Sequence, residues 1–277
     1  AFFPLTGFLG KEDYDNVLEN LRLLNGSLWP IPITLDVSET FAQSIKLDEN
    51  IALCDQEGVI LATMNISDKW VPDKIHEAKK VFGTADEYHP GVDYLLNNSG
   101  KIYLGGQIRG IEPPAHYDFR DRRNTPNEMR THFAKIGWKK IIAFQTRNPM
   151  HRAHEELCKM ALDRLDADGV LIHMTLGKLK EGDIPGDVRD AAIRKMVEIY
   201  FPENTAIISG FGFDMMYAGP REALLHAVFR QNAGCTHLIV GRDHAGVGDY
   251  YEPFGAQDIF DQDIVKNSLK IEIFKAD

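Results

Sequence analysis

The stretch that decides the fold is Trp138 to Leu157, WKKIIAFQTRNPMHRAHEEL. Its short apolar run, Ile141 to Phe144, is typical of a buried strand and is closed by polar turn residues. Pro149 is tolerated at the start of a helix, and apolar residues recur at near-helical spacing from Ala153 to Leu165. We therefore expect a strand, a turn and a helix, with the turn at the sheet edge where open α/β sheets bind ligands.

Three side chains in this turn can bind the oxygens of an anion. Arg147 carries a planar guanidinium that grips two oxygens at once, and His151 and His154 lie about one helical turn apart, on the same face. The unpaired N–H groups of a helix start point the same way. A zinc site is the alternative for the two histidines, but the arginine between them and Asn148 before them are poor metal neighbours. We therefore predict oxyanion recognition and no protein-bound metal.

The chain from residue 118 onward predicts a parallel sheet. Short apolar runs alternate there with longer amphipathic segments, which is the pattern of strands joined by helical, right-handed crossovers. The expected strands are 140–144, 169–176, 205–209, 237–240 and 269–274, and the expected helices are 125–133, 152–165, 187–200, 220–232 and 258–265. Residues 118–277 are therefore predicted to form one α/β domain.

Residues 1–117 predict a different, β-rich domain. Short β-branched runs at 33–37, 50–55, 58–64 and 101–111 suit antiparallel pairing, with a hairpin turn at 55–58. Helices are expected at 13–24 and 72–82, a turn at 88–92, and a packed loop at 2–10. His76 and His89 stand alone in the sequence, and we expect both to be structural. We predict a compact α+β or β-barrel-like domain without a reaction centre.

A second, glycine-rich turn follows the strand expected at 236–240. The run Gly241-Arg242-Asp243-His244-Ala245-Gly246-Val247-Gly248 has three glycines, which let backbone approach a ligand closely, and two charge-bearing side chains. Alone, such a loop is more often a plain strand-to-helix turn. Because parallel strands end at the same edge of a sheet, we expect it to meet the turn at 145–154 in one site. The helix opening at 219–223, GPREA, either points at that site or is a capped helix with a surface ion pair.

The charge of the chain is unevenly distributed. Its 277 residues have a net charge of −10, yet residues 118–154 hold nine Arg or Lys against three acids. Positive charge gathered beside an anion-binding turn favours a small polyanionic ligand, and a solvated basic face is the alternative. The acidic balance of the whole chain disfavours a general nucleic-acid or acidic-membrane binder.

The composition is that of a globular protein in a reducing compartment. Hydrophobic residues make up 44% of the chain, and no apolar run approaches the roughly 18 residues that a membrane helix needs. Cys54, Cys158 and Cys235 are scattered and form no zinc-type pair. The chain contains neither a GxxxxGK[ST] phosphate loop nor a GxSxG nucleophile motif. We expect a cytoplasmic protein without a membrane segment.

Two motifs resemble those of the ATP sulfurylase family, also called sulfate adenylyltransferase. The first, Gln145 to His154, QTRNPMHRAH, is similar to the family's QxRNPxHxxH signature, and the second, Gly241 to Gly246, is similar to its GRDHAG loop. The segments Pro4 to Phe8 and His89 to Gly91 resemble its amino-terminal landmarks, so the likeness covers essentially the whole chain. The paired histidines also resemble the HxGH element of a wider nucleotidyltransferase superfamily, with Ala153 where glycine would stand.

The resemblance implies a PUA-like domain over residues 1–117 and a Rossmann-like catalytic nucleotidyltransferase domain over 118–277. It implies that ATP and sulfate give adenosine 5′-phosphosulfate (APS) and pyrophosphate, with Mg²⁺ accompanying ATP, in a homodimer or larger homo-oligomer. By motif position, sulfate would bind Gln145, Arg147 and the backbone of Ala245. The positions implied for catalysis are Thr146, Arg147, Asn148, His151, His154 and Arg242. Those implied for nucleotide binding are Gln145, Thr146, Arg147, Asn148, His151, His154, Gly241, Arg242, Asp243 and His244.

The residue types in the two turns suit this reaction. Sulfate carries no proton at neutral pH and needs no base, and its attack on the α-phosphorus brings two anions together, so positioning and charge stabilisation must supply the catalysis. We hypothesise that His151 and His154 donate hydrogen bonds to phosphate oxygens and to the leaving pyrophosphate. The attack would be in line, without a covalent enzyme intermediate.

Two other interpretations stay open. A related nucleotidyltransferase would use an organic phosphate as acceptor, and a PUA-like domain would suit a nucleic-acid module, which the acidity disfavours. The same site would serve sulfate assimilation or ATP formation in sulfur oxidation, depending on partner enzymes. Compared with the family, the chain begins inside the first domain and ends at Asp277, so we expect a longer protein. The APS kinase phosphate loop of a bifunctional enzyme is not in this sequence.

Overall fold

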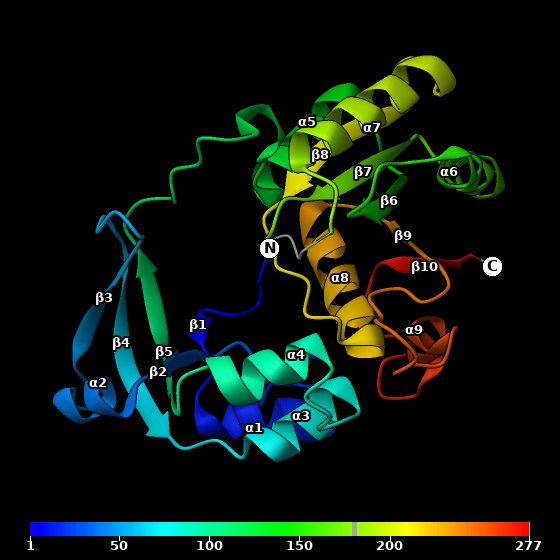
Figure 1. Cartoon of the computed structure of the whole chain (residues 1–277). Coiled ribbons are helices and arrows are strands. Elements are labelled where there is room, and N and C mark those ends of the chain that lie inside the picture. The colour runs from blue at the N-terminus through cyan, green and yellow to red at the C-terminus, as the bar shows by residue number, and fades with distance from the viewer. Residues whose placement is uncertain (179–181, 277) are drawn as a thin grey trace.

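The computed structural model describes residues 1–178 and 182–276 and contains two separate sheets (Figure 1). The first sheet is antiparallel, as predicted. It consists of β1 (Gly7–Phe8), β2 (Leu35–Val37), β3 (Asn50–Cys54), β4 (Ile60–Trp70) and β5 (Ile102–Gly110). The expected hairpin turn joins β3 to β4, where the Asp55 carboxylate accepts the N–H groups of Glu57 and Val59 at 2.9 Å each.

Two short elements of this domain were not expected. Residues 7 and 8 pair with β5 as a strand, because Gly7 and Gly106 bring the backbones so close that a Cβ on Gly7 would lie 2.0 Å from the Gly106 carbonyl oxygen. The helix α2 (Glu39–Ser44) begins at Ser38, whose hydroxyl accepts the N–H of Phe41. A six-residue helix is too short to show a periodicity in the sequence.

The remaining helices of the first domain are α1 (Lys11–Asn20) and α3 (Lys74–Phe82), followed by α4 (Pro90–Asp93) and the π-helix η1 (Tyr94–Asn98). α1 ends earlier than predicted, because Leu21 adopts the left-handed conformation with φ 55°. The prediction of a simple turn at 88–92 is wrong. The ring nitrogen Nδ1 of His89 accepts the N–H of Gly91 and starts a helix there, although histidine is not among the usual capping residues.

The second sheet is parallel throughout, as predicted, with the strand order β10-β9-β6-β7-β8. Its strands are β6 (Ile141–Thr146), β7 (Gly169–Thr175), β8 (Ala206–Phe211), β9 (His237–Val240) and β10 (Glu272–Lys275). Its helices are α5 (Pro126–Ile136), α6 (Arg152–Leu165), α7 (Gly186–Tyr200), α8 (Gly219–Ala233) and α9 (Gly255–Asp258), with 3₁₀ turns η2 (Arg120–Arg122) and η3 (Ile259–Asp261). In place of the last predicted helix, 258–265, the structure has the short helix α9 and the 3₁₀ turn η3, which begin three residues earlier than predicted and end at Asp261.

Both faces of this sheet are covered by helices (Figure 1). Ile142 and Phe144 of β6 pack on the side of α6 and α7, whereas Ile141 and Ala143 pack on the side of α5, α8 and α9. β6 is the central strand: β7 and then β8 lie on one side of it, and β9 and then β10 lie on the other, so the direction in which strands are added reverses after β8. This reversal between β6 and β9 opens a crevice at the carboxyl ends of those two strands.

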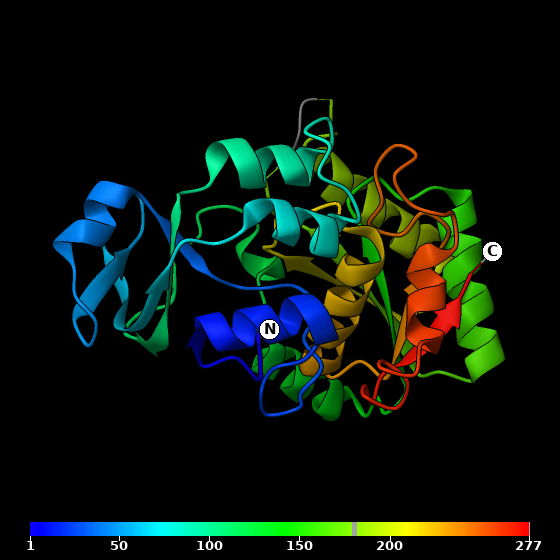
Figure 2. The same ribbon diagram turned by 90° about the horizontal axis from the view of Figure 1, so that it is seen from below.

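Helix α8 of the second domain packs against the first domain. Most of its residues are buried, and Leu225 and Phe229 share one apolar cluster with Val17, Leu18 and Trp29 of the first domain. Figure 2 shows the blue and cyan helices of the first domain beside the gold α8. Within the described part of the chain, no helix combines the length and the hydropathy needed to cross a bilayer.

Candidate active site at the switch point of the parallel sheet

The turn after β6 is built by its threonine. The Thr146 hydroxyl donates to the carbonyl oxygen of Asn148 at 2.8 Å and accepts the N–H of Asn148 at 3.1 Å. Thr146 is buried, whereas Asn148 is exposed. Pro149 lies ahead of α6, which begins at Arg152 as predicted. Thr146 therefore holds the turn in shape and Asn148 faces outward.

Arg147 projects from this turn into a cavity. Its Nη1 lies 3.4 Å from Asp183 Oδ1 and 3.5 Å from the Tyr217 hydroxyl, and its Cζ lies 5.5 Å from the centre of the Tyr217 ring. Asp183 forms a salt bridge with the guanidinium, and Asp183 and Tyr217 together orient it, although both polar distances are at the long limit for hydrogen bonds. This geometry suits an arginine that binds an anion.

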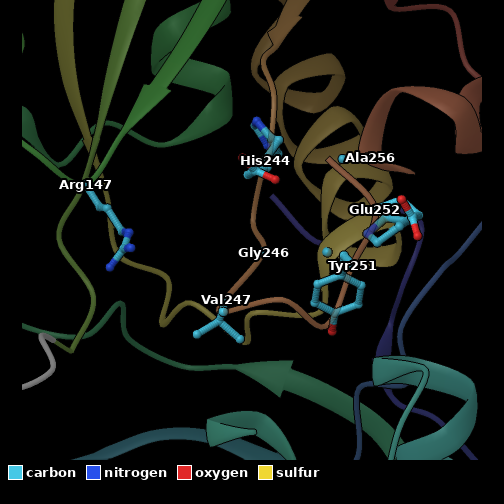
Figure 3. Close-up of a pocket in the computed structure, with 11 residues that line it drawn as sticks. Arg147, His244, Gly246, Val247, Tyr251, Glu252 and Ala256 are labelled. Carbon is cyan, nitrogen blue, oxygen red and sulfur yellow. The ribbon is translucent and has the colours of Figure 1, made fainter. Parts of the chain in front are cut away.

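The cavity has a volume of about 280 Å³ and lies between Arg147 and the loop that follows β9. Figure 3 shows Arg147 on one side, with His244, Gly246 and Val247 of the loop across from it. The start of α8 and Tyr251 complete the wall. The structure thus brings the two predicted turns together, as the common edge of parallel strands required.

The loop after β9 is held in an unusual backbone conformation. Asp243 and Ala245 have positive φ angles of 54° and 56°, and the Ala245 carbonyl accepts the N–H of Gly219 at 3.0 Å. This bond ties the loop to the first residue of α8. Gly219 itself has φ 51°, and a Cβ there would lie 2.7 Å from the Tyr251 ring. Such conformations persist where the surrounding structure fixes them, often at functional sites.

The buried side chains of Glu222 and His226 lie beneath this loop and meet its half-buried His244. His244 Nε2 is 3.1 Å from His226 Nδ1, and His226 Nε2 is 3.4 Å from Glu222 Oε1. Burial, with His226 and Arg230 nearby, lowers the pKa of His244 to about 3. Burial also raises the pKa of Glu222 to about 7. At neutral pH the two histidines are therefore uncharged, and their polar contacts form a chain that leads from the cavity wall into the core.

Glu222 also binds the backbone of the segment before α8. Its carboxylate accepts the N–H groups of Met216 at 3.1 Å and Ala218 at 2.9 Å, so it fixes the segment that carries Tyr217. Glu222 and His226 were not predicted as site residues. A signal was present, since Glu222, His226 and Arg230 recur every four residues along one helix and thus share a face.

Gln145 reaches His226 from β6. Its Nε2 lies 3.5 Å from His226 Nε2 and 3.5 Å from Met215 Sδ, and its Oε1 is buried without a hydrogen-bond partner among the described residues. These are weak contacts for a buried amide, which leaves its hydrogen-bonding capacity for a ligand or water. Gln145 is thus available for the sulfate contact that the resemblance implies.

His151 and His154 stand at the start of α6, outside the wall of the cavity. Burial, and secondarily His151, lower the pKa of His154 below its usual value. His151 is exposed and His154 is half-buried. Neither histidine lines the cavity, so the structure does not bring the predicted pair together with Arg147 there.

Arg242 lies apart from the cavity. Its side chain is exposed, its Nε is 3.3 Å from Asp243 Oδ2, and its Cζ lies 5.9 Å from the Phe254 ring. Of the other predicted positions in this loop, Asp243 and His244 line the cavity, whereas Gly241 and Ala245 do not. Asp183, Tyr217 and Tyr251 were not predicted, because they lie in loops that carry no periodic pattern.

Comparison with known proteins assigns the family. Residues 120–277 match the sequence model of ATP-sulfurylase, and residues 1–113 match that of a PUA-like domain. The chain belongs to the ATP-sulfurylase family. This also confirms the predicted fold class, a PUA-like domain followed by a parallel-sheet α/β domain.

The relatives of this chain that we compared are named sulfate adenylyltransferase. The chain is 52% identical to the sulfate adenylyltransferase of Alcanivorax borkumensis, covering 100% of this chain and 70% of the relative. It is 50% identical to that of Thiobacillus denitrificans, covering 98% and 66%. A solved structure described as a hexameric APS kinase from Thiobacillus denitrificans superposes with a TM-score of 0.71 at 28% identity, covering 99% of this chain and 47% of that one. This chain thus spans about two thirds of its relatives and about half of the solved neighbour.

Proposed function

We propose that this chain catalyses the transfer of the adenylyl group of ATP to sulfate, giving APS and pyrophosphate. The proposal is supported by the name that relatives about 50% identical share and by the family match of the second domain. The single observation that carries it is the position of Arg147 opposite His244 and Val247 in one cavity at the switch point of the sheet.

In the proposed reaction, a sulfate oxygen attacks the α-phosphorus of ATP. A sulfate O–P bond forms while the bond from the α-phosphorus to the bridging oxygen of pyrophosphate breaks, so no proton is transferred and no enzyme group is adenylylated. Arg147, Gln145 and the Ala245 N–H would hold sulfate. The nucleotide phosphates would lie along Thr146, Asn148, His151, His154 and the loop Gly241 to His244.

The catalytic contribution would be electrostatic. Two anions meet during the attack, and negative charge moves onto the leaving pyrophosphate. Arg147 and Arg242 would offset that charge, and the two histidines would donate hydrogen bonds to the oxygens that gain it. In the present structure Arg242 is exposed beside Asp243 and outside the cavity, so this role requires its side chain to turn toward the phosphates when the nucleotide binds.

Mg²⁺ would enter with ATP, where it neutralises charge on the phosphate oxygens. Among the described residues, no three His, Cys, Asp or Glu side chains cluster as a metal site. Mg²⁺ commonly keeps several waters and binds through substrate phosphates with few protein ligands, so the residues present are compatible with this mode.

The same proposal leads to expectations for localisation, assembly and metabolic role. We expect a cytoplasmic homo-oligomer, and the description of the solved neighbour as hexameric supports assembly without fixing a number of subunits. Because one site catalyses both directions, the enzyme would serve sulfate assimilation or ATP-forming sulfur oxidation according to the enzymes that remove its product.

Two assays separate this function from its alternatives. Full-length protein should release pyrophosphate from ATP only when sulfate, or molybdate as its mimic, is present, and should form ATP from APS and pyrophosphate. A nucleotidyltransferase with an organic phosphate acceptor would do neither. Retardation of RNA at low salt would favour a nucleic-acid function of the first domain, and we expect none.

A further inference from the structure

His89 of the first domain reaches into the second domain beside the active site. It has no exposed surface, and its Nε2 lies 3.0 Å from the carbonyl oxygen of Tyr217 and 3.1 Å from the hydroxyl of Tyr251. Its Nδ1 accepts the N–H of Gly91 at 3.1 Å. A neutral ring that accepts at Nδ1 carries its proton on Nε2, so His89 donates to the Tyr217 carbonyl. Burial lowers the pKa of His89, which keeps this ring neutral at pH 7.

The segment that receives this hydrogen bond is strained and firmly held. Tyr217 has φ 60°, a conformation that bulky residues seldom adopt. The Tyr251 hydroxyl donates to the same carbonyl oxygen at 2.9 Å, and Glu222 accepts the N–H groups on either side of Tyr217. The backbone at Tyr217 is therefore fixed from the first domain, from the loop after β9 and from α8 together.

Tyr217 in turn orients Arg147. Its hydroxyl is 3.5 Å from Arg147 Nη1, and its ring lies 5.5 Å from Arg147 Cζ. A displacement of the Tyr217 backbone would move both contacts. A continuous set of contacts thus runs from His89, through Tyr217, to the guanidinium proposed to bind sulfate.

The residues around His89 fit the same surface. A Cβ on Gly91 would lie 2.6 Å from the Met216 carbonyl oxygen, so only glycine permits this approach of α4 to the segment. On the other side, the Tyr250 ring packs edge-on against His89 at 5.0 Å, and the Tyr250 hydroxyl donates to Asp86 at 2.8 Å. The run His89-Pro90-Gly91 therefore packs closely against the segment that carries Tyr217 and against the loop after β9.

We propose that His89 is a positioning residue of the anion site, which fixes Tyr217 and through it Arg147, so that the first domain sets the geometry of the site in the second. The kinetic part of this inference rests on the proposed function.

Two substitutions separate the two roles of the ring. His89→Asn keeps an acceptor that can cap α4 but is too short to donate to Tyr217, whereas His89→Gln keeps a donor at the reach of Nε2 and loses the cap. If His89 positions the site, the Asn variant should lose on the order of 10-fold to 100-fold in kcat/KM for sulfate with a nearly unchanged Tm. The Gln variant should retain more of that activity even if its Tm falls. Tyr251→Phe, which removes the second donor, should show a smaller loss in the same direction.

A second readout does not depend on activity. The ¹H–¹⁵N resonance of Arg147 Nε, assigned by its loss in Arg147→Lys, should shift in the Asn variant and stay near its wild-type position in the Gln variant. An Asn variant that is folded, has wild-type kcat/KM and leaves this resonance unmoved would overturn the inference, as would equal losses in both variants. An inactive wild-type protein would contradict the proposed function, and the resonance would then decide on His89 alone. If the Asn variant does not fold, the Gln variant decides, and a shifted resonance together with a large loss of kcat/KM in it would overturn the proposal.

Discussion

The rings of His151 and His154 lie with their centres 3.8 Å apart and their planes tilted by 31°, and the backbone N–H of His151 donates to Nδ1 of His154 at 3.4 Å. Because Nδ1 is an acceptor in this arrangement, neutral His154 carries its proton on Nε2, which is thereby ready to donate to an anion. The lowered pKa of His154 keeps the ring in this neutral form at pH 7. His154 is thus arranged to donate a hydrogen bond from Nε2, which is the role that the proposed function gives it.

This arrangement predicts how the histidines respond to substitution. His151→Ala and His154→Ala should each lower kcat by a factor on the order of 10², as the loss of one donor to a developing oxyanion does elsewhere. His154→Gln retains an N–H near the position of Nε2 and should recover part of the loss, whereas His154→Asn should not. Steady-state kinetics in both directions measure this. Turnover near wild type in both alanine variants would show that neither ring contacts the reacting phosphates.

Arg147 should not tolerate lysine. Lysine keeps the charge but lacks the planar fork and cannot stack on Tyr217, so Arg147→Lys should lower kcat/KM for sulfate by roughly 10² or more. Titration calorimetry with sulfate in the presence of a non-hydrolysable ATP analogue should show weakened binding. Arg130→Lys is the matched control, because Arg130 binds carbonyl oxygens at the far end of α8. Equal effects of the two substitutions would rule out a specific anion contact at Arg147.

Replacement of Gly219 by alanine should destabilise the fold. Its φ of 51° and the Tyr251 ring, which would lie 2.7 Å from an added Cβ, combine backbone strain with a clash, so Gly219→Ala should lower the free energy of unfolding by about 1–3 kcal/mol. Gly241→Ala is the control, since nothing lies within 4 Å of a Cβ there. It should change the free energy of unfolding by less than about 0.5 kcal/mol. Urea unfolding measures both, and similar stabilities would contradict the close contact with Tyr251.

The buried His173 should make the fold sensitive to acid. Burial and the nearby Arg230 hold its pKa well below the usual value. As the pH falls from 7 to 5, the unfolded chain binds a proton at this residue that the folded chain does not, so stability falls with pH. A histidine that stays neutral at pH 5 contributes a loss of roughly 2 kcal/mol over this range.

The matched variant isolates this contribution. His173→Phe places another ring beside Phe211 and removes the titration, so its loss of stability between pH 7 and pH 5 should be smaller than that of the wild type. The raised pKa of Glu222 acts in the opposite direction, because the unfolded chain releases that proton at lower pH, but it acts in both proteins and cancels. Equal pH dependence of urea unfolding in the two proteins would contradict a neutral His173.

Much of the fold was predictable because the elements of the second domain are regular. α6 and β9 begin and end where their apolar patterns do, and the common edge of parallel strands was enough to bring Arg147 and His244 together. The first domain was less predictable, because α4 is started by a histidine side chain and β1 by an approach that only glycines allow. Local pattern contains no sign of either contact.

The missing part of the site has the same explanation. α8 is buried on all sides, so its hydrophobic pattern does not mark the face that carries Glu222 and His226. Tyr217 and His89 meet only through tertiary structure, 128 positions apart in the chain. Motifs therefore identified residues that would touch ligand, whereas the residues that hold them in place needed the structure.

The central claim is tested most directly by measuring pyrophosphate release from ATP by wild-type protein and by Arg147→Ala, with and without sulfate. The proposed site predicts release that depends on sulfate in the wild type and falls by on the order of 10³ in the variant, whose Tm should be nearly unchanged. Release that does not need sulfate, or that persists at the wild-type rate in folded Arg147→Ala, would contradict it.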